Sequence, residues 1–313
     1  MAQKIFIFGG NSYLAYELTF FLAKKHKFND IYSVSRSKNN FYDNNVLHLD
    51  TSEFFKDNNR VEDAIVYYFI SLDRSECQIS KSSIDVNLGL FTKTISKFSN
   101  SKIIYLSTFS VYRDDWDFDT ITENSPISFS HPYGMSHYQC EVVGRDLSVR
   151  CNNLFVPVRL TNAFGWKERF FAERYVLNSL IYSAFSNNEV ELKSDGNFVR
   201  DFIYITDVLS ILELFISDNY VYTLGSINIC SQKSYLIRDV AMLVQKLSEI
   251  ELNTKIGLSI SGSSFDLNPD FSISPVVNSV VKSIVFDRIG SEFKSIEDGI
   301  TLALKFLKST NPK

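Results

Sequence analysis

The chain of 313 residues has little of what marks disulfide-rich, metal-binding or membrane proteins. Its four cysteines are scattered without a Cys-x-x-Cys pair, which excludes the usual zinc and redox motifs and favours structural thiols in a reducing compartment. No apolar run is long enough to span a bilayer, and the first ten residues lack the long apolar core of a signal peptide. We therefore expect a cytoplasmic protein without a metal site or a membrane segment.

An excess of basic residues is also lacking. Lysine and arginine together number 32, against 36 aspartates and glutamates, so the formal net charge is -4. This balance argues against nucleic-acid binding, and an anionic ligand would have to be bound by individual arginines. The hydrophobic fraction of 45% lies near the globular average, and the length suits one α/β domain with a lobe or two modest domains.

Short apolar runs alternate with amphipathic stretches in the first half of the chain. Strands are predicted at residues 4–8, 30–34, 45–49, 64–70, 102–107 and 154–160, and helices at residues 13–25, 86–98 and 134–151. This alternation predicts an α/β fold with a Rossmann-type, doubly wound parallel sheet. Beyond residue 160 the pattern loosens into predicted helices separated by short strands, at residues 172–187, 206–217, 236–251 and 296–307. A smaller C-terminal lobe is therefore expected.

A glycine turn joins the first predicted strand to the first helix. It reads Gly9-Gly10-Asn11-Ser12-Tyr13-Leu14-Ala15. A helix that begins there presents backbone N–H groups and the positive end of its dipole to a pyrophosphate. The dinucleotide fingerprint requires small residues at positions 9, 12 and 15, and the chain has Gly, Ser and Ala. Taken alone, the segment also fits an ordinary strand-helix turn.

The second predicted strand ends in Ser33-Val34-Ser35-Arg36-Ser37. Proteins that bind NAD usually place an acidic residue here to hold the ribose hydroxyls, and Ser35 occupies that position. A carboxylate would repel a 2′-phosphate, whereas Arg36 can bind one through charge-assisted hydrogen bonds. The sequence therefore predicts NADP(H) as the preferred cofactor, with NAD(H) possible. The alternative is that Arg36 is an ordinary surface arginine.

Two later segments carry the residues of a possible active site. One apolar strand ends at Ser107-Thr108, and the segment Pro132-Tyr133-Gly134-Met135-Ser136-His137 follows it. These segments resemble the extended short-chain dehydrogenases/reductases, specifically the NAD(P)-dependent epimerase/dehydratase family, which modifies nucleotide-linked sugars. That family has a Ser or Thr after this strand and a Tyr-x-x-x-Lys on the next helix. Thr108 and Tyr133 match, and His137 occupies the lysine position.

The resemblance continues downstream over most of the chain. Residues 159–165 are similar to the family's Arg-x-x-Asn-x-Tyr-Gly element, and residues 200–207 resemble its nucleotide-sugar segment almost letter for letter. The similarity extends at least to residues 226–230. It implies a dinucleotide-binding domain over residues 1–160, to which later segments return. Residues 161–313 would mainly form a lobe that binds a nucleotide-diphosphate sugar.

The resemblance also implies a role for particular residues. The catalytic residues would be Thr108, Tyr133 and His137. The cofactor would be bound by Gly9, Ser12, Tyr13, Leu14, Ser35, Arg36, Asp50, Thr51, Asn87, Tyr133 and His137. The substrate would be bound by Thr108, Asn162 and Arg200. A homodimer is a further expectation from the family.

The histidine at the family's lysine position, His137, affects which type of reaction is expected. Tyrosine ordinarily has a pKa of about 10, and the family's lysine helps it to ionise. Histidine is mostly neutral near pH 7, so oxidation of a hydroxyl should suffer more than reduction of a ketone. The family's dehydratases have Asp-Glu after the threonine, where this chain has Phe109-Ser110. We therefore expect an NADPH-dependent reductase of a nucleotide-linked keto-deoxysugar. The alternatives are an epimerase that retains NAD(P) and a catalytically impaired binding protein.

Overall fold

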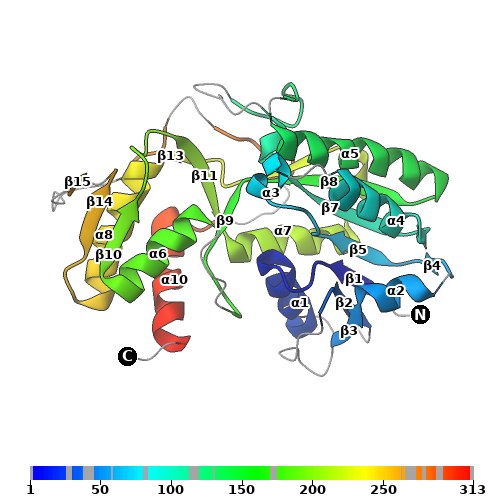
Figure 1. The fold of residues 1–313 in the computed structure, drawn as a ribbon, viewed down its shortest axis with the longest axis horizontal. Helices are drawn as coiled ribbons and strands as arrows, with labels where there is room; N and C mark the ends of the chain where they lie inside the picture. The colour runs from blue at the N-terminus through cyan, green and yellow to red at the C-terminus, as the bar shows by residue number, and fades with distance from the viewer. Residues whose placement is uncertain are drawn as a thin grey trace. The chain divides into compact units, whose positions relative to one another are not determined.

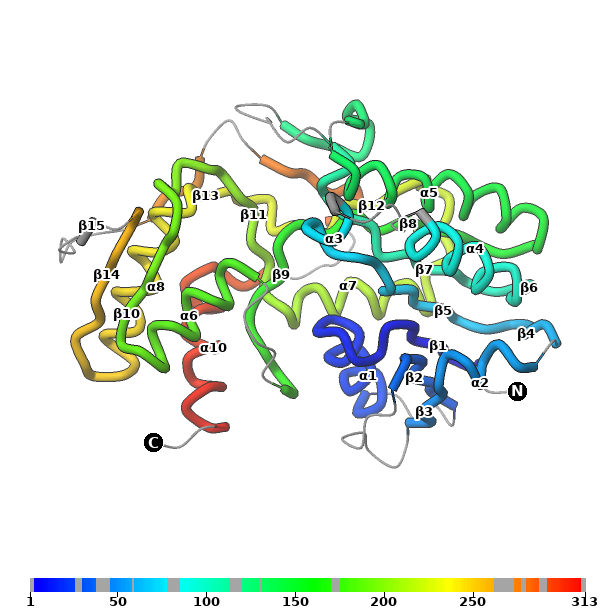
Figure 2. Tube along the Cα trace, in the orientation of Figure 1, coloured from blue at the N-terminus to red at the C-terminus, as the bar shows by residue number. Residues whose placement is uncertain are grey.

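The computed structural model describes twelve segments of the chain (Figure 1, Figure 2). They are residues 3–25, 30–37, 46–57, 59–79, 84–112, 120–129, 131–169, 175–261, 263–264, 273–276, 280–286 and 292–310. Contacts divide the chain into two compact units. Unit 1 consists of Met1–Asp115, Glu123–Leu160 and Leu209–Asn228, and unit 2 of Trp116–Thr122, Thr161–Val208 and Ile229–Lys313.

A seven-stranded sheet forms the centre of unit 1, in the order β12-β8-β7-β5-β1-β2-β3. Its strands are β1 (Ile5–Phe8), β2 (Ile31–Ser35), β3 (Val46–Asp50), β5 (Ile65–Tyr68), β7 (Lys102–Thr108), β8 (Leu154–Leu160) and β12 (Ile227–Ile229). Strand β1 pairs in parallel with β2 on one side and with β5 on the other, so the strand order reverses there. Ligands of doubly wound sheets bind at such a switch point. The predicted Rossmann-type α/β class is confirmed.

Helices cover both faces of this sheet (Figure 1). They are α1 (Tyr13–Lys25), α2 (Thr51–Lys56), α3 (Arg74–Ile79), α4 (Leu90–Ile95), α5 (Pro132–Arg150) and the later part of α7 (Ile205–Ser217). Helices α4 and α5 lie on one face. Helices α1 and α7 lie on the other, joined by the ion pair of Lys25 with Glu213 at 2.6 Å. The Tyr67 hydroxyl of β5 donates to the carbonyl of Leu212, which fixes α7 to the sheet.

Aromatic rings fill the space between the sheet and helices α4 and α5. Alternate residues of a strand share a face, and in this way Phe6, Phe8, Tyr68 and Tyr105 point toward the same cluster of buried residues. Phe6 and Phe8 meet the ring of Phe98 edge to face, with ring centroids 5.4 and 6.1 Å apart. Such pairs add to the stabilisation from burial. The abundant Phe and Tyr of the sequence thus form a core.

Two small sheets and three helices make up most of unit 2. One sheet has the order β13-β11-β9, from β9 (Asn162–Phe164), β11 (Val199–Tyr204) and β13 (Ser234–Leu236). The other has the order β10-β14-β15, from β10 (Glu189–Leu192), β14 (Gly257–Ile260) and β15 (Ser263–Ser264). The helices are α6 (Val176–Asn187), α8 (Ile237–Leu252) and α10 (Ile296–Thr310). Helices α6 and α8 each end at an asparagine in the left-handed conformation, a common helix stop.

Most predicted elements lie within two residues of their observed bounds. The helix predicted over residues 172–187 is observed at Val176–Asn187, and the helix predicted over residues 296–307 continues to Thr310. The largest difference concerns a third helix. The helix predicted over residues 86–98 is a π-helix at Ile84–Gly89 and an α-helix at Leu90–Ile95, and the chain then enters strand β6 (Phe98–Ser99). Phe98 leaves the helix because it is fully buried and pairs with Val61 of β4 (Val61–Glu62). Residues 120–122 belong to unit 2 because the Ile121 N–H donates to the carbonyl of Val280.

Membrane-spanning helices, clustered metal ligands and paired cysteines are all absent from the described part of the chain. No helix there combines the length and the apolar character needed to cross a membrane. Within the same residues, no cluster of three or more His, Cys, Asp or Glu side chains is arranged to bind a metal ion. The four cysteines are unpaired and buried: Cys77, Cys140, Cys151 and Cys230.

Candidate active site

The glycine turn adopts a conformation that requires glycine. Gly9 has a φ of +86°, and a Cβ atom there would lie 3.3 Å from the carbonyl carbon of Phe69. The Gly9 N–H donates to the carbonyl of Val34 at 2.9 Å. The turn is thus held close to the backbone that continues from β5, at the switch point of the sheet.

Helix α1 begins directly after this turn. Its first helical hydrogen bond runs from the Tyr16 N–H to the carbonyl of Ser12 at 2.9 Å. The preceding N–H groups of a helix have no acceptor within it, which makes this end an anion-binding site. The predicted pyrophosphate contacts Ser12, Tyr13 and Leu14 lie at this end, and their role remains a prediction.

The carbonyl of Ser37, just after β2, accepts three side-chain hydrogen bonds. The donors are Asn11 Nδ2 at 3.0 Å, the Ser35 hydroxyl at 2.8 Å and His48 Nε2 at 3.0 Å. Asn11 Nδ2 also reaches the Ser37 hydroxyl at 3.1 Å. Ser35, in the acid position of NAD binders, therefore bonds to its own loop, and this loop carries Arg36.

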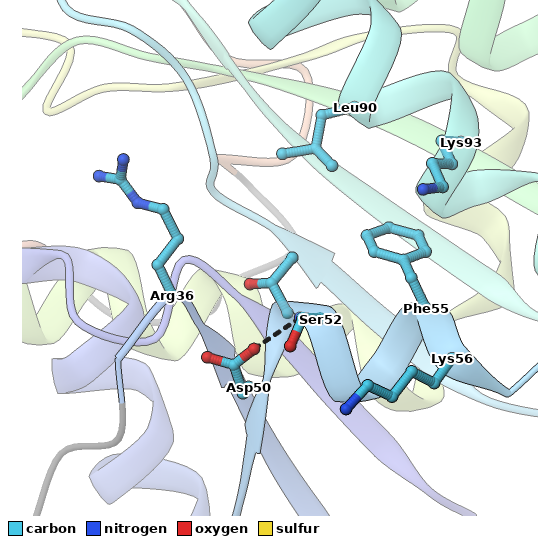
Figure 3. A pocket seen from close by; sticks show the side chains of 8 residues that line it. Arg36, Asp50, Ser52, Phe55, Lys56, Leu90 and Lys93 are labelled. Atoms are coloured by element: carbon cyan, nitrogen blue, oxygen red, sulfur yellow. Dashed lines mark hydrogen bonds between the residues drawn. The ribbon is translucent and has the colours of Figure 1, made fainter.

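A pocket of about 570 Å³ lies beside this loop (Figure 3). Its walls are Arg36, Asp50, Thr51, Ser52, Phe55, Lys56, Leu90 and Lys93. The Asp50 carboxylate caps α2 by accepting from the Ser52 N–H at 2.7 Å. The pocket has three cationic side chains and one carboxylate, a composition that suits an anionic ligand. The structure thus brings together three predicted cofactor residues: Arg36, Asp50 and Thr51.

Asn87 is buried, with both ends of its amide hydrogen-bonded. Its Oδ1 accepts from the Leu72 N–H at 2.7 Å, and its Nδ2 donates to the Ser136 hydroxyl at 2.9 Å. It therefore joins the segment after β5 to helix α5. This structural linkage was not expected from the sequence, and its predicted contact with the cofactor remains untested.

Thr108 ends β7 and begins a 3₁₀ turn. Its hydroxyl oxygen accepts from the Ser110 N–H at 3.2 Å, so the O–H keeps a proton to donate. Tyr133 is the second residue of α5. Gly134 makes the two elements meet, because a Cβ at this position would overlap the carbonyl oxygen of Ser110. The elements that carry Thr108 and Tyr133 are thus packed directly against each other.

The start of α5 is fixed by His131, a residue that the sequence reasoning missed. Its Nδ1 accepts from the Tyr133 N–H at 3.0 Å, and Pro132 occupies the first helical position. A proline there was a usable sign of a helix start, and it places the start two residues before the predicted one. Histidine is not among the usual caps, which hid the contact.

His137 lies inside the core, between two tyrosine rings. Its Nδ1 is 2.8 Å from the Tyr105 hydroxyl, and its ring meets that of Tyr133 edge to face at 4.6 Å. Its Nε2 is buried and has no hydrogen-bond partner among the residues that the structure describes. Burial lowers the pKa of His137 to about 3, so the imidazole is neutral at physiological pH.

A buried ionic network holds the end of β7 next to Thr108. Glu141 of α5 accepts from the Ser107 hydroxyl at 2.6 Å and from two guanidinium nitrogens of Arg159, at 3.0 and 2.7 Å. Arg159 also donates to the Tyr112 hydroxyl at 2.8 Å, which donates to Asn228 at 2.9 Å. Burial, partly opposed by Arg159, raises the pKa of Tyr112 to about 12. No motif in the sequence indicated that Tyr112 and Asn228 would belong to this network.

The two predicted substrate residues of unit 2 lie on adjacent strands. Asn162 of β9 pairs with Phe202 of β11, and its Nδ2 donates to the Asp201 carbonyl at 2.9 Å. Arg200 lies two residues earlier on β11, so both residues face the same side of the sheet. Arg200 is partly exposed, and its guanidinium is 5.8 Å from the ring centroid of Phe198.

Asp201, next to Arg200, is a buried carboxylate that the sequence reasoning left without a role. It accepts hydrogen bonds from the Thr161 hydroxyl, the Ser231 N–H and hydroxyl, and the Lys233 N–H, at 2.8 to 3.2 Å. It therefore fixes the turn after β12 to β11. Desolvation outweighs these bonds and raises the pKa of Asp201 to about 6.

Comparison with known proteins decides the family. The sequence profile of the NAD dependent epimerase/dehydratase family matches residues 5–230. The chain belongs to this family. A putative UDP-glucose 4-epimerase of Methanocaldococcus jannaschii is 28% identical over 116 residues, which are 36% of this chain and 37% of the relative. A dTDP-D-glucose 4,6-dehydratase of Dictyostelium discoideum is 23% identical over 72% of this chain and 58% of the relative. The chain thus matches less than two thirds of the length of either curated relative.

Solved structures agree with the fold of this family member. The UDP-glucose 4-epimerase of Thermotoga maritima, determined with UDP-glucose, has a TM-score of 0.74 at 16% identity, covering 98% of this chain and 99% of its own. An NAD-dependent NDP-hexosamine 5,6-dehydratase of tunicamycin biosynthesis has a TM-score of 0.73 at 20% identity, covering 99% of both chains. The UDP-glucuronic acid 4-epimerase of Bacillus cereus, in complex with NAD, has a TM-score of 0.72 at 15% identity, covering 99% and 97%.

Proposed function

We propose that the protein is an NADPH-dependent reductase of a keto group on a nucleotide-linked deoxysugar. Family membership and the fold support a dinucleotide cofactor and a nucleotide-sugar substrate. The observation that carries the direction of the reaction is the neutral, buried imidazole of His137 beside Tyr133. A neutral neighbour does not help a phenol to ionise, so Tyr133 is better suited to donate a proton than to remove one.

The described residues fit a dinucleotide. Gly9 lets the turn lie against the backbone of Phe69, and the start of α1, directly after this turn, can bind the pyrophosphate. The unpartnered Nε2 of His137 can meet a ribose hydroxyl. NADPH, when bound, supplies the hydride that the reaction requires.

The preference for NADPH over NADH is supported by the composition of the pocket. Arg36, Lys56 and Lys93 line it, and Ser35 replaces the acidic residue that would repel a 2′-phosphate. The Asp50 carboxylate is engaged as the cap of α2, so its charge is partly compensated by the helix N-terminus.

The protein's own residues act on the sugar oxygen. The Thr108 O–H donates a hydrogen bond to the ketone oxygen and holds it. The Tyr133 hydroxyl would give its proton to the same oxygen, so that the ketone, reduced with the hydride that NADPH would supply, ends as an alcohol. Tyr133 then regains a proton from solvent. In unit 2, Arg200 and Asn162 bind the diphosphate of the nucleotide sugar, because a planar guanidinium suits phosphate oxygens.

The test mixes purified protein, NADPH and a nucleotide-linked 4-keto-6-deoxyhexose and follows the absorbance of reduced cofactor. We expect stoichiometric NADPH consumption, and a Tyr133→Phe variant at least about 100-fold slower, as for loss of a general acid. Tyr138→Phe, a change on the same helix, is the matched control and should retain its rate. Absence of NADPH consumption with several nucleotides would refute the reductase.

An epimerase with retained cofactor is a second candidate, favoured by the epimerase structures that share this fold. Such an enzyme must first oxidise a hydroxyl, which requires a base. A His137→Lys variant should raise alcohol oxidation at pH 7 by about tenfold or more and change ketone reduction much less. An epimerase would instead copurify with its dinucleotide and interconvert sugars without net consumption of NADPH.

We further propose a cytoplasmic homodimer. The four unpaired, buried thiols suit a reducing compartment. On α5, the exposed apolar residues Met135, Val142 and Val149 recur every seven residues, a spacing typical of a helix that packs against another helix. Sedimentation of the wild type and of a Val142→Glu variant tests the dimer, which the charge should dissociate.

A further inference from the structure

Tyr105 links His137 to the core of the protein. It lies on β7, its side chain is almost completely buried, and its hydroxyl is 2.8 Å from His137 Nδ1. The ring of His137 therefore has one nitrogen bound from inside the core. The other nitrogen, Nε2, is buried without a partner. A neutral imidazole carries one N–H donor and one bare acceptor nitrogen, so the proton on this ring decides what Nε2 can do.

The hydrogen bonds behind Tyr105 give the direction of this chain. The Cys140 thiol lies next to the Tyr105 hydroxyl, and its sulfur is 3.5 Å from the backbone carbonyl oxygen of Asn87. A carbonyl can only accept, so the Cys140 S–H donates to Asn87. The Tyr105 O–H can then donate to the sulfur, and the Tyr105 oxygen accepts from His137. This is the arrangement in which Tyr105 and Cys140 each donate one hydrogen bond and accept one.

We infer that Tyr105 is a positioning residue, which holds His137 protonated at Nδ1 so that Nε2 offers a lone pair to a ribose hydroxyl of the dinucleotide. This inference rests on the proposed function for its ligand. A lysine ammonium at this position could only donate a hydrogen bond, whereas Nε2 in this form can only accept one. The ribose hydroxyl must therefore donate its proton toward His137. The buried lone pair, which has no partner among the described residues, gains one when the dinucleotide binds.

Nuclear magnetic resonance on protein labelled with ¹⁵N-histidine tests the first half of this inference. Long-range ¹H–¹⁵N spectra separate a protonated ring nitrogen from a bare one, and a His137→Gln variant assigns the signals among the four histidines. We expect Nδ1 protonated and Nε2 bare, unchanged between about pH 5 and pH 9 because the ring is buried. A wild-type ring protonated at Nε2 would overturn the inference without any need for a variant.

Tyr105→Phe removes the hydroxyl, and Tyr68→Phe is its matched control. Tyr68 is a fully buried tyrosine of β5, its ring centroid is 6.2 Å from that of Tyr105, and among the described residues its hydroxyl interacts with Thr94 and not with His137. We expect Tyr105→Phe to mix the two protonation forms of His137 and Tyr68→Phe to leave the spectrum unchanged. An unaltered spectrum in Tyr105→Phe would contradict the positioning role.

Titration with NADP⁺ tests the ligand half. We expect the Nε2 signal to move on binding while Nδ1 stays in place, and Tyr105→Phe to weaken NADP⁺ binding by about five- to tenfold, the value of one hydrogen bond. Tyr68→Phe should bind within about twofold of wild type. Binding that leaves Nε2 unmoved overturns the ribose contact. Failure to bind NADP⁺ or NAD⁺ at all would overturn the proposed function, while the protonation spectra would still decide the role of Tyr105.

Discussion

Each unit of the molecule contains a fully buried carboxylate, and the two are stabilised in different ways. Glu141 in unit 1 is paired with the guanidinium of Arg159 through two hydrogen bonds. Asp201 in unit 2 is held by hydroxyl and backbone N–H donors around it. A cation compensates a buried charge directly, whereas hydroxyl and N–H dipoles compensate it only in part, so that burial raises the pKa of Asp201. The strand end beside Thr108 therefore has a charge-paired support, and the strand of Arg200 has one that can titrate.

The largest expected effect comes from breaking the paired carboxylate. Glu141→Gln leaves Arg159 buried without its counter-charge, which should cost about 3–5 kcal/mol of unfolding free energy. Urea unfolding measures this loss of stability. Native-state hydrogen exchange of the amides in β7 and β8 shows whether the loss is located at these strands. Arg150→Ala is the matched control, because it removes an exposed ion pair with Asp146 on the same helix and should cost less than about 1 kcal/mol. Equal losses in both variants would contradict the comparison.

The second prediction separates the two units by their ligands. Arg36→Leu should weaken binding of 2′,5′-ADP by about 10- to 100-fold, the value of a lost charge-assisted contact, and leave UDP binding unchanged. Arg200→Leu should do the reverse. Calorimetry with each probe and each variant measures the four affinities. Loss of both ligands in either variant would indicate misfolding of a unit and would sink this assignment.

The third prediction uses the titration of Asp201. Its folded pKa of about 6 lies above the ordinary value of 3.8, so the folded protein binds the proton more tightly. The contribution to stability therefore grows as the pH falls from about 6 toward 3.8, and it is lost as the pH rises through 6. From pH 7 to pH 5 the gain should be about 1 kcal/mol.

Tryptophan fluorescence reports this effect, because Trp166 is buried in unit 2. The gain should be absent in Asp201→Asn, whose urea midpoint at pH 7 should also be lower because an amide N–H₂ faces some of the same donors. A difference between wild type and variant that stays constant with pH would rule out the shifted pKa.

The smallest expected effect concerns the loop that carries Arg36. Asn11→Ala removes two hydrogen bonds to Ser37 and should weaken 2′,5′-ADP binding about three- to tenfold. Binding of 5′-AMP should stay within about twofold, because Asn11 acts on the side of the 2′-phosphate. An equal loss for both nucleotides would show that Asn11 supports the whole turn instead.

Much of the fold follows from the sequence, because apolar periodicity decides which segments become strands and helices. The strand predicted at residues 154–160 is β8, and the helix predicted at residues 13–25 is α1, with identical bounds. The exception, Phe98, left its predicted helix because pairing with Val61 buried its ring. Such a choice depends on a partner 37 residues away, and no local pattern contains it.

The candidate site was predictable where it depends on motifs and hidden where it depends on packing. Thr108, Tyr133 and Arg36 stand in recognisable segments. Tyr105 and Cys140 read as core residues in the sequence, because one lies in an apolar strand and the other in an amphipathic helix. Their polar atoms meet His137 and Asn87 only after the sheet and α5 have packed together.

Gly134 allows helix α5, which carries the proposed proton donor Tyr133, to lie directly against the turn that follows β7. Since the backbone of α5 lies against the Ser110 carbonyl, one methyl group at position 134 would wedge the helix away from the strand end. The proposed catalytic side chains Thr108 and Tyr133 would be unchanged, but they would no longer be aligned with each other. Gly134→Ala would thus displace the proposed proton donor Tyr133 and the proposed ribose contact His137 together, because both belong to α5.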